Sequence, residues 1–246
     1  GVDTLARKDA KNLMLLGAGK QAPFQIAATL ILRPNLEKVY IVDPVNYPQA
    51  QGLAARIKEQ LKTEFKVDAD NVEFIAEESI EKATKEADAI ITVSRAMQPM
   101  IMKEWVKPGT HLSCLGSDME GDELMKKTLE QWNKAAKIYT DDKKQCIRVG
   151  EIELALKGGV ITEDAIVGEF GDLLCGDVVG RENDEEITMF DATGLYILDL
   201  VAAKVAIAKA KEAKKIVLAP IDARIRIGGD FNRAFRNQVM VQGDLI

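Results

Sequence analysis

The sequence predicts an α/β fold in which helices cover both faces of a parallel sheet, on three observations. Short apolar segments alternate with amphipathic ones between residues 12 and 140, an order typical of right-handed βαβ units. Residues 89–93 form a nearly uninterrupted apolar run, as in a central parallel strand. A glycine-rich turn, residues 17–22, separates the first apolar segment from the first helical one. We therefore expect a doubly wound sheet of the Rossmann type, with a long C-terminal helix and a short irregular tail.

The first half of the chain provides four predicted strands and three predicted helices. The strands are residues 12–16, 38–42, 72–75 and 89–93, and the helices are residues 24–33, 50–65 and 79–87. The second helix follows from the spacing of Leu53, Ile57 and Leu61, which places one apolar face on the sheet. Ser79 is the expected N-cap of the third. These elements build the first half of the sheet.

The second half continues the pattern less regularly. Strands are expected at residues 111–115, 137–140 and 187–190, and helices at 123–135, 151–156, within 168–177 and at 195–213. A further helix start is expected at Thr162, and the tail from Ile216 resembles one strand with an irregular end. About six parallel strands are thus complete by residue 140. We expect a dinucleotide-binding domain over residues 1–213 and a C-terminal tail over residues 214–246.

The composition excludes several classes of function. A net charge of −6 argues against a nucleic-acid partner, which would need clustered Lys and Arg. No apolar run reaches the roughly 18 to 20 residues of a membrane span. Cys114, Cys146 and Cys175 lie far apart and are odd in number, so neither a disulfide framework nor a metal site is expected. Free thiols indicate a reducing compartment, and the protein is expected in the cytoplasm.

The glycine-rich turn and an acidic residue predict a dinucleotide site. Gly17, Gly19 and Ala22 form the pattern G-x-G-x-x-A, which allows a tight turn, a close approach of a pyrophosphate and packing of helix on strand. Asp43 ends the second strand 26 positions after Gly17, where an acidic residue binds ribose hydroxyls and repels a 2′-phosphate. NAD is therefore favoured over NADP. The alternative is a doubly wound domain that uses these glycines only for packing.

Polar residues after two other strands lie on the same predicted rim of the sheet. Asp118 follows the strand at 111–115, and there it acts either as an acid/base or ammonium partner, or as the N-cap of the next helix. Thr92 and Ser94 follow the strand at 89–93, and either contact the cofactor ribose or form an ordinary turn. His111 begins its strand, away from this rim, which favours a structural role over acid/base chemistry.

Two other functional interpretations have less support. No G-x-S-x-G turn accompanies the serine, histidine and aspartate residues, so a hydrolase triad is not expected. The tail has four arginines that form either an anion-binding patch or a charge-protected edge strand, namely Arg224, Arg226, Arg233 and Arg236.

With these motifs, the sequence resembles the ornithine cyclodeaminase/μ-crystallin family, which includes archaeal-type alanine dehydrogenase and ketimine reductases. The resemblance covers about residues 5–213. It includes the segments Leu-Ala-Arg-Lys-Asp-Ala-Lys-Asn-Leu-Met-Leu-Leu-Gly-Ala-Gly, Ala-Asp-Ala-Ile-Ile-Thr-Val-Ser, Trp-Val-Lys-Pro-Gly-Thr-His-Leu, Gly-Ser-Asp-Met-Glu-Gly, Gly-Glu-Ile and Glu-Ile-Thr-Met-Phe-Asp-Ala-Thr-Gly. It implies NAD(P)-dependent hydride transfer at the α-carbon of an amino acid through an imine, as in alanine dehydrogenase or ornithine cyclodeaminase.

The resemblance also assigns residues. It implies Asp118 as the catalytic acid/base, the adenosine ribose on Asp43, and Thr193 near a small amino-acid or imine substrate. The remaining implied cofactor contacts follow the glycine turn and two strand ends: Gly17, Ala18, Gly19, Lys20, Gln21, Thr92, Ser94, Ser113, Cys114, Leu115 and Gly116. The complete protein is expected to be a homodimer.

The chain also departs from the family pattern. Asp122 stands where the family has a lysine, and Ala192 where it has a serine. The N-terminal substrate and dimerisation half is absent from this chain. The alternative function is therefore a non-catalytic NAD(P)-binding module, as in μ-crystallin, or an inactive fragment.

Overall fold

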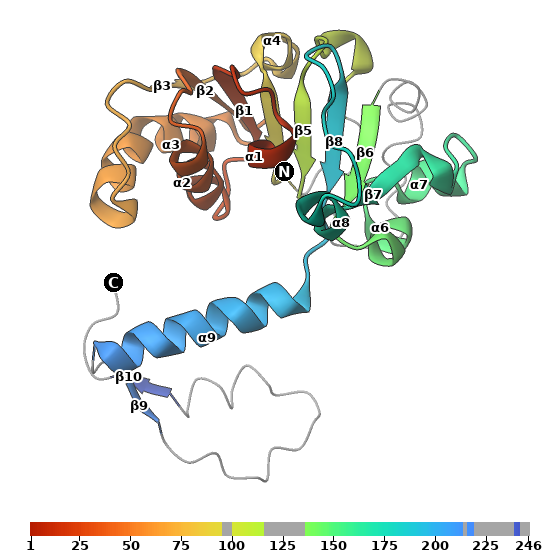
Figure 1. Cartoon of the computed structure of the whole chain (residues 1–246). Helices are drawn as coiled ribbons and strands as arrows, with labels where there is room; N and C mark the ends of the chain where they lie inside the picture. Colours follow the sequence, from red (N-terminus) through yellow and green to blue (C-terminus); the bar gives the residue numbers. More distant parts are fainter. Residues whose placement is uncertain (95–99, 116–135, 214–215, 219–238, 242–246) are drawn as a thin grey trace. The chain divides into compact units, whose positions relative to one another are not determined.

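The computed structural model describes residues 1–94, 100–115, 136–213, 216–218 and 239–241. The chain divides into two compact units, Gly1–Thr193 and Gly194–Ile246. The sequence groups the long helix with the sheet domain, and the domain boundary at residue 213 stays a prediction. Each unit is described by itself below (Figure 1).

The first unit is built on a sheet of eight parallel strands (Figure 1). They are β1 Asn12–Leu16, β2 Lys38–Val42, β3 Glu73–Ala76, β4 Ala89–Thr92, β5 His111–Cys114, β6 Ala136–Thr140, β7 Ile166–Glu169 and β8 Ile187–Asp191. Their order across the sheet is β3-β2-β1-β4-β5-β8-β6-β7. From β1 the chain adds β2 and β3 on one side, and it then returns to add β4 and β5 on the other side of β1. This change of direction makes the sheet doubly wound. The predicted fold class is confirmed.

The place of one strand in the sheet could not be read from the sequence, and another strand was not predicted. β8 lies between β5 and β6, pairing in parallel with both, although it is the last strand of the sheet in the sequence. β7 was not expected, because only four residues form it and Gly168 interrupts its apolar pattern. The helix expected within residues 168–177 accordingly begins only at Phe170, and a short 3₁₀ turn at Glu163–Ala165 replaces the helix start expected at Thr162.

The helices of this unit lie close to predicted segments from α2 to α4 and at α7 and α8, whereas no helix was predicted at residues 143–149. They are α1 Val2–Leu5, α2 Ala22–Leu32, α3 Tyr47–Gln60 with a π-turn at Leu61–Phe65, α4 Ile80–Glu86, α6 Lys143–Val149, α7 Glu153–Lys157 and α8 Phe170–Cys175. Ser79 caps α4 as expected, since its hydroxyl accepts a hydrogen bond from the backbone N–H of Lys82 (3.2 Å). The helix expected at residues 123–135 lies outside the described residues.

The sheet is buried on both faces. Leu13 and Leu15 of β1 belong to one apolar cluster, which includes residues of α2 and α3. Met14 and Leu16 belong to a second cluster, with residues of α4, α6 and α7. Because successive side chains of a strand point to opposite faces, this division shows a helical layer on each side.

Asp88 ties the chain together where β4 begins. Its buried carboxylate pairs with Lys107 (2.7 Å) and Arg7 (3.3 Å), and accepts hydrogen bonds from the backbone N–H groups of Lys11 (2.8 Å) and Asn12 (2.9 Å). Burial alone would raise the pKa of Asp88, but these hydrogen bonds outweigh it and hold that pKa below its ordinary value. The carboxylate thus fixes the segment that leads into β1.

Replacing Asp88 by alanine should lower the free energy of unfolding by about 2 kcal/mol, because it leaves two backbone N–H groups and two cations without their buried acceptor. Urea denaturation measures this difference. The matched control is Glu81→Ala, which removes an exposed ion pair with Lys85 and should change the free energy by less than about 1 kcal/mol. Equal effects of the two substitutions would contradict a structural role for Asp88.

The second unit contains the long predicted helix, α9 Tyr196–Glu212. Two short strands, β9 Ile216–Leu218 and β10 Val239–Val241, pair antiparallel, whereas one strand was expected in the tail. The four arginines of the tail lie outside the described residues. None of the described helices is long and apolar enough to cross a membrane.

Candidate functional site

The turn between β1 and α2 has the geometry that a phosphate-binding loop needs. Gly17 has a positive φ of 109°, and a Cβ atom at this position would lie 2.8 Å from the carbonyl oxygen of Val93. A Cβ atom on Gly19 would meet nothing within 4 Å. Gly17 is therefore required by the turn itself, whereas Gly19 keeps the space beside the loop open. Lys20 and Gln21 are exposed at the same turn.

Asp43 lies beside this turn, at the end of β2. One carboxylate oxygen accepts a hydrogen bond from the N–H of Ala18 (3.1 Å), and the other accepts from Asn46 (3.0 Å) and Val45 (3.3 Å). The side chain of Gln49 donates to the carbonyl oxygen of Ala18 (2.8 Å). The fold thus brings the glycine turn and Asp43 together, as the dinucleotide pattern requires.

Polar side chains end four neighbouring strands in one row. Thr92, Cys114, Asp191 and Thr140 are paired in register across β4, β5, β8 and β6. Burial raises the pKa of the Cys114 thiol well above its ordinary value, so this cysteine is not an activated nucleophile. Ser94, just beyond β4, is half-buried. The row lies at the carboxyl edge of the sheet, where open α/β sheets bind ligands.

His111 and Ser113 face the other side of β5. The imidazole of His111 is fully buried between the hydroxyls of Thr188 (Nδ1, 2.9 Å) and Ser113 (Nε2, 2.9 Å). Burial holds the pKa of His111 well below its ordinary value, so the ring is neutral. This arrangement matches the structural role predicted for His111. It also engages the hydroxyl of Ser113, and the cofactor contact predicted for Ser113 stays a prediction.

The end of β8 brings Thr193, which the family resemblance places near the substrate, together with polar groups that were not predicted as site residues. Thr193 donates to a carboxylate oxygen of Asp141 (3.3 Å), and the thiol of Cys146 donates to the same oxygen (3.2 Å). The carboxyl of Asp191 is fully buried, and burial raises its pKa to about 8. Asp191 was visible in the segment Asp-Ala-Thr-Gly, but no pattern in that segment indicates that its carboxyl is buried.

The residue predicted to be catalytic, Asp118, is not part of the described site. Asp118 and Gly116 are outside the described residues, so their predicted roles remain predictions. Leu115 follows β5 and is half-buried, and its N–H donates to the carbonyl oxygen of Thr92 (3.0 Å). The described part of the site therefore comprises the glycine turn, Asp43 and the strand ends. No group of three or more metal-ligating side chains occurs in this described part of the chain.

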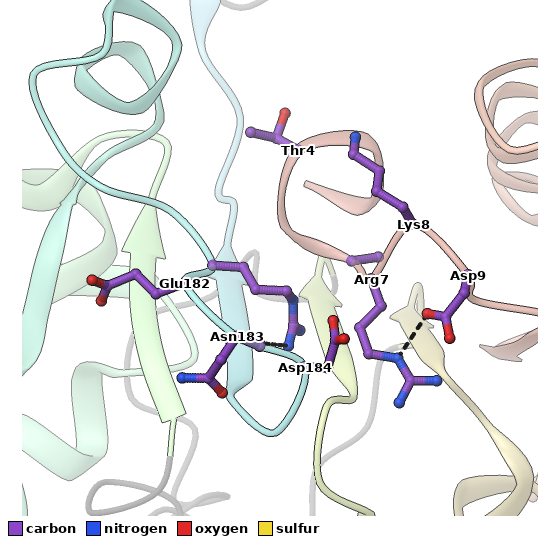
Figure 2. Close-up of a pocket in the computed structure, with 9 residues that line it drawn as sticks. Thr4, Arg7, Lys8, Asp9, Glu182, Asn183 and Asp184 are labelled. Carbon is purple, nitrogen blue, oxygen red and sulfur yellow. Dashed lines mark hydrogen bonds and ion pairs between the residues drawn. The ribbon is translucent and has the colours of Figure 1, made fainter.

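A polar cleft of about 440 Å³ lies near the amino ends of β4 and β8, away from these residues. Its lining is Thr4, Ala6, Arg7, Lys8, Asp9, Arg181, Glu182, Asn183 and Asp184. Figure 2 shows Arg7 turned toward Asp9, with which it forms an ion pair (3.1 Å). The guanidinium of Arg181 donates to the carbonyl oxygens of Leu5 (2.7 Å) and Glu186. These charges hold neighbouring segments together, and none of the predicted site residues lines the cleft.

Comparison with known proteins identifies one family for this chain. The model of the ornithine cyclodeaminase/mu-crystallin family matches residues 1–214. The chain belongs to this family. The resemblance predicted from the sequence motifs is thereby confirmed, and the family model covers the glycine turn, Asp43 and the segment through Thr193.

Several relatives in the ornithine cyclodeaminase/mu-crystallin family are enzymes. Iminosuccinate reductase of Paracoccus denitrificans is 34% identical over 207 residues, covering 84% of this chain and 59% of the relative. Alanine dehydrogenase of Archaeoglobus fulgidus is 32% identical over 201 residues, covering 82% of this chain and 57% of that relative. The chain thus spans about three fifths of the length of these relatives.

Solved structures of the family share the fold at similar identity. Delta(1)-pyrroline-2-carboxylate reductase of Thermococcus litoralis, in complex with NADH and L-proline, superposes with a TM-score of 0.74 at 31% identity, covering 87% of this chain and 62% of that one. An archaeal alanine dehydrogenase dimer with bound NAD gives a TM-score of 0.77 at 30% identity, covering 90% of this chain and 63% of that one.

Proposed function

We propose that this chain is the NAD-binding part of an amino-acid oxidoreductase or deaminase that transfers a hydride at the α-carbon through an imine. The observation that carries the proposal is the hydrogen bond between the Ala18 N–H and the Asp43 carboxylate, which joins a phosphate-binding turn to a ribose-binding group. Relatives solved with NAD or NADH support the cofactor. The reductases and dehydrogenases among the relatives support the reaction class.

The residues present fit NAD. The open space beside Gly19 would accommodate a pyrophosphate, and the N–H groups of the turn at residues 19–21, at the start of α2, would hold it. Asp43 would bind the adenosine ribose hydroxyls. Thr92, Ser94 and the segment 113–116 would contact the rest of the cofactor, which supplies the hydride donor or acceptor when bound.

The protein's own groups would handle the proton and the substrate. We assign Asp118 as the acid/base that moves a proton to or from the amine or water while the imine forms or breaks. Thr193 would face the substrate, and its hydroxyl is held by the Asp141 carboxylate. The substrate is a small amino acid or the corresponding imine.

Replacing Asp43 by asparagine should remove the preference for NADH over NADPH. The carboxylate repels a 2′-phosphate and accepts hydrogen bonds from the ribose. We therefore expect the dissociation constant for NADPH, divided by that for NADH, to fall by about tenfold, which corresponds to about 1.4 kcal/mol of binding free energy. Titration of the chain with each nucleotide, followed by nucleotide fluorescence, measures both constants. Asp70→Asn, at an exposed position, is the control. Tighter NADPH binding by the unchanged chain would overturn the role of Asp43.

The alternative is a nucleotide-binding module without catalysis. The discriminating experiment uses the complete protein that contains this chain. NADH formation is followed with a panel of amino acids, imine reduction is followed with NADH, and ammonia release is measured from ornithine. Turnover in any of these assays supports the enzyme, whereas NAD binding with no turnover in all three favours the module.

Two further expectations concern the complete protein. We propose that it is a homodimer, since an archaeal alanine dehydrogenase of the same family was solved as a dimer, and light scattering of the purified protein tests this. All three cysteines are free, which supports a reducing compartment such as the cytoplasm.

A further inference from the structure

The carboxyl of Asp191 joins two segments that are far apart in the sequence. Its Oδ2 atom accepts a hydrogen bond from the backbone N–H of Ile152 (3.3 Å). A Cβ atom on Gly150 would lie 2.4 Å from the same oxygen, so only glycine lets the loop before α7 approach this closely. The loop at residues 150–152 is therefore fitted around the carboxyl.

The backbone of Asp191 holds the rest of this edge. Its carbonyl oxygen accepts hydrogen bonds from the N–H of Asp141 (3.1 Å) and the thiol of Cys146 (3.5 Å). The carboxylate of Asp141 in turn accepts from the Thr193 hydroxyl (3.3 Å). Asp191 thus lies at the junction of β6, α6, the loop before α7 and the Thr193 segment.

The backbone N–H groups of Glu151 and Ile152 favour the charged form of this carboxyl, but burial and the titratable groups that face it among the described residues outweigh them. Within the described part of the chain these titratable groups are Asp141 after β6, Cys146 in α6, Glu151 in the loop before α7 and Cys114 in β5, and none of them is a cation. Burial, with the charge of Glu151, raises the pKa of Asp191 to about 8. Its Oδ1 atom is buried and has no hydrogen-bond partner among the described residues. At neutral pH the side chain therefore keeps its proton.

We propose that Asp191 is a positioning residue that holds the loop at residues 150–152 against the end of β8 and thereby fixes the Thr193 hydroxyl on the substrate side of the site. The placement of Thr193 toward the substrate rests on the proposed function, whereas the role of Asp191 in holding the loop at residues 150–152 does not. Ionisation would place a negative charge among acidic neighbours in a buried site, so the loop must open to hydrate it.

The direct test is hydrogen exchange of the Ile152 amide in the complete protein, corrected for the intrinsic rate at each pH. We expect strong protection at pH 6.5 that falls severalfold by pH 8.5. Asp191→Asn, which keeps an acceptor and carries no charge, should remain protected at both pH values, and Asp191→Ala should lose protection at both. Thr140→Val is the control, since the Thr140 hydroxyl is buried in the same row and has no hydrogen-bond partner among the described residues. An Asn variant with the wild-type pH dependence would overturn the proposal.

Thermal unfolding gives a second measurement. An aspartate releases its proton near pH 4 in the unfolded chain but near pH 8 in this fold, so the folded state binds one more proton between these values. This group's stabilisation is therefore complete below about pH 4 and is lost as the pH rises to about 8. The melting temperature of wild type, relative to Asp191→Asn at the same pH, should fall steadily from pH 6 to pH 8. A constant difference would overturn the neutral carboxyl.

Kinetics of the complete protein separate this inference from the proposed function. We expect kcat/KM of the wild type to fall above pH 8, the Asn variant to lack this limb, and the Ala variant to lose at least tenfold at every pH, with NADH affinity equal in all three. Absence of turnover with every amino acid and imine, combined with the expected exchange results, would reject the proposed function and keep the loop-fixing role. Equal kcat/KM for wild type and the Ala variant would reject the positioning role alone.

Discussion

Replacing Gly17 by alanine is expected to weaken NADH binding by this chain strongly. Two costs combine at this position: the backbone adopts a φ of 109°, which L side chains rarely adopt, and the new Cβ atom would lie 2.8 Å from the Val93 carbonyl oxygen. Strain of this kind costs about 1–3 kcal/mol before the steric contact is added. The turn must shift away from β4, and we expect the dissociation constant for NADH to rise at least about 100-fold.

The matched control for this substitution is Gly19→Ala. A Cβ atom on Gly19 would have no atom within 4 Å, so the midpoint of urea unfolding should be the same for this variant as for the wild type. Its methyl group would nevertheless occupy space needed by the pyrophosphate, and NADH affinity should fall by about tenfold. The pair separates a glycine that the fold requires from one that the ligand requires. Wild-type NADH affinity in both variants would remove the turn from the binding site.

The parts of the fold that the sequence predicted correctly depend on local patterns. The strands near residues 12–16, 38–42 and 89–92 are short apolar runs between helical segments, and each of them is visible in its own sequence. The position of β8 between β5 and β6 is not local, because it depends on which edges pair after the chain has folded. β7 was missed for a different reason, since four residues with a central glycine have little strand preference of their own.

The same distinction explains the site. Gly17 and Asp43 were predicted because turn chemistry and the spacing between strand ends leave a mark in the sequence. Asp191 was not, because its acidic neighbours Asp141 and Glu151 come from separate segments of the chain, and its burial depends on how these segments pack. Ser113 shows the converse: its place on β5 was predicted, but the structure gives its hydroxyl to His111. The two side chains lie two positions apart on β5 and so share one face of the sheet. Whether they contact each other depends on the rotamers that the surrounding packing selects, which a single sequence does not contain.

Replacing Asp118 by asparagine should lower the turnover of the complete protein by roughly 10²- to 10⁴-fold, the usual contribution of a positioned acid or base. Asparagine keeps the size and polarity of the side chain but cannot exchange a proton with the amine or water. Asp118 follows β5, whose carboxyl end lies at the same edge of the sheet as those of β1 and β8. NADH affinity should therefore change by less than about twofold, because binding uses the glycine turn and Asp43.

Steady-state kinetics with the amino acid or imine that shows turnover, together with NADH titration, measure both quantities for the Asp118 variant. Glu120→Gln is the matched control, because it also neutralises an acidic residue of the same segment, two positions away. A selective loss of kcat in the Asp118 variant identifies a group acting on the reacting atoms, since a change in substrate binding alone would raise KM at constant kcat. Normal turnover would remove Asp118 from the mechanism, and an equal loss in the Glu120 variant would indicate general dependence on the charge of this segment.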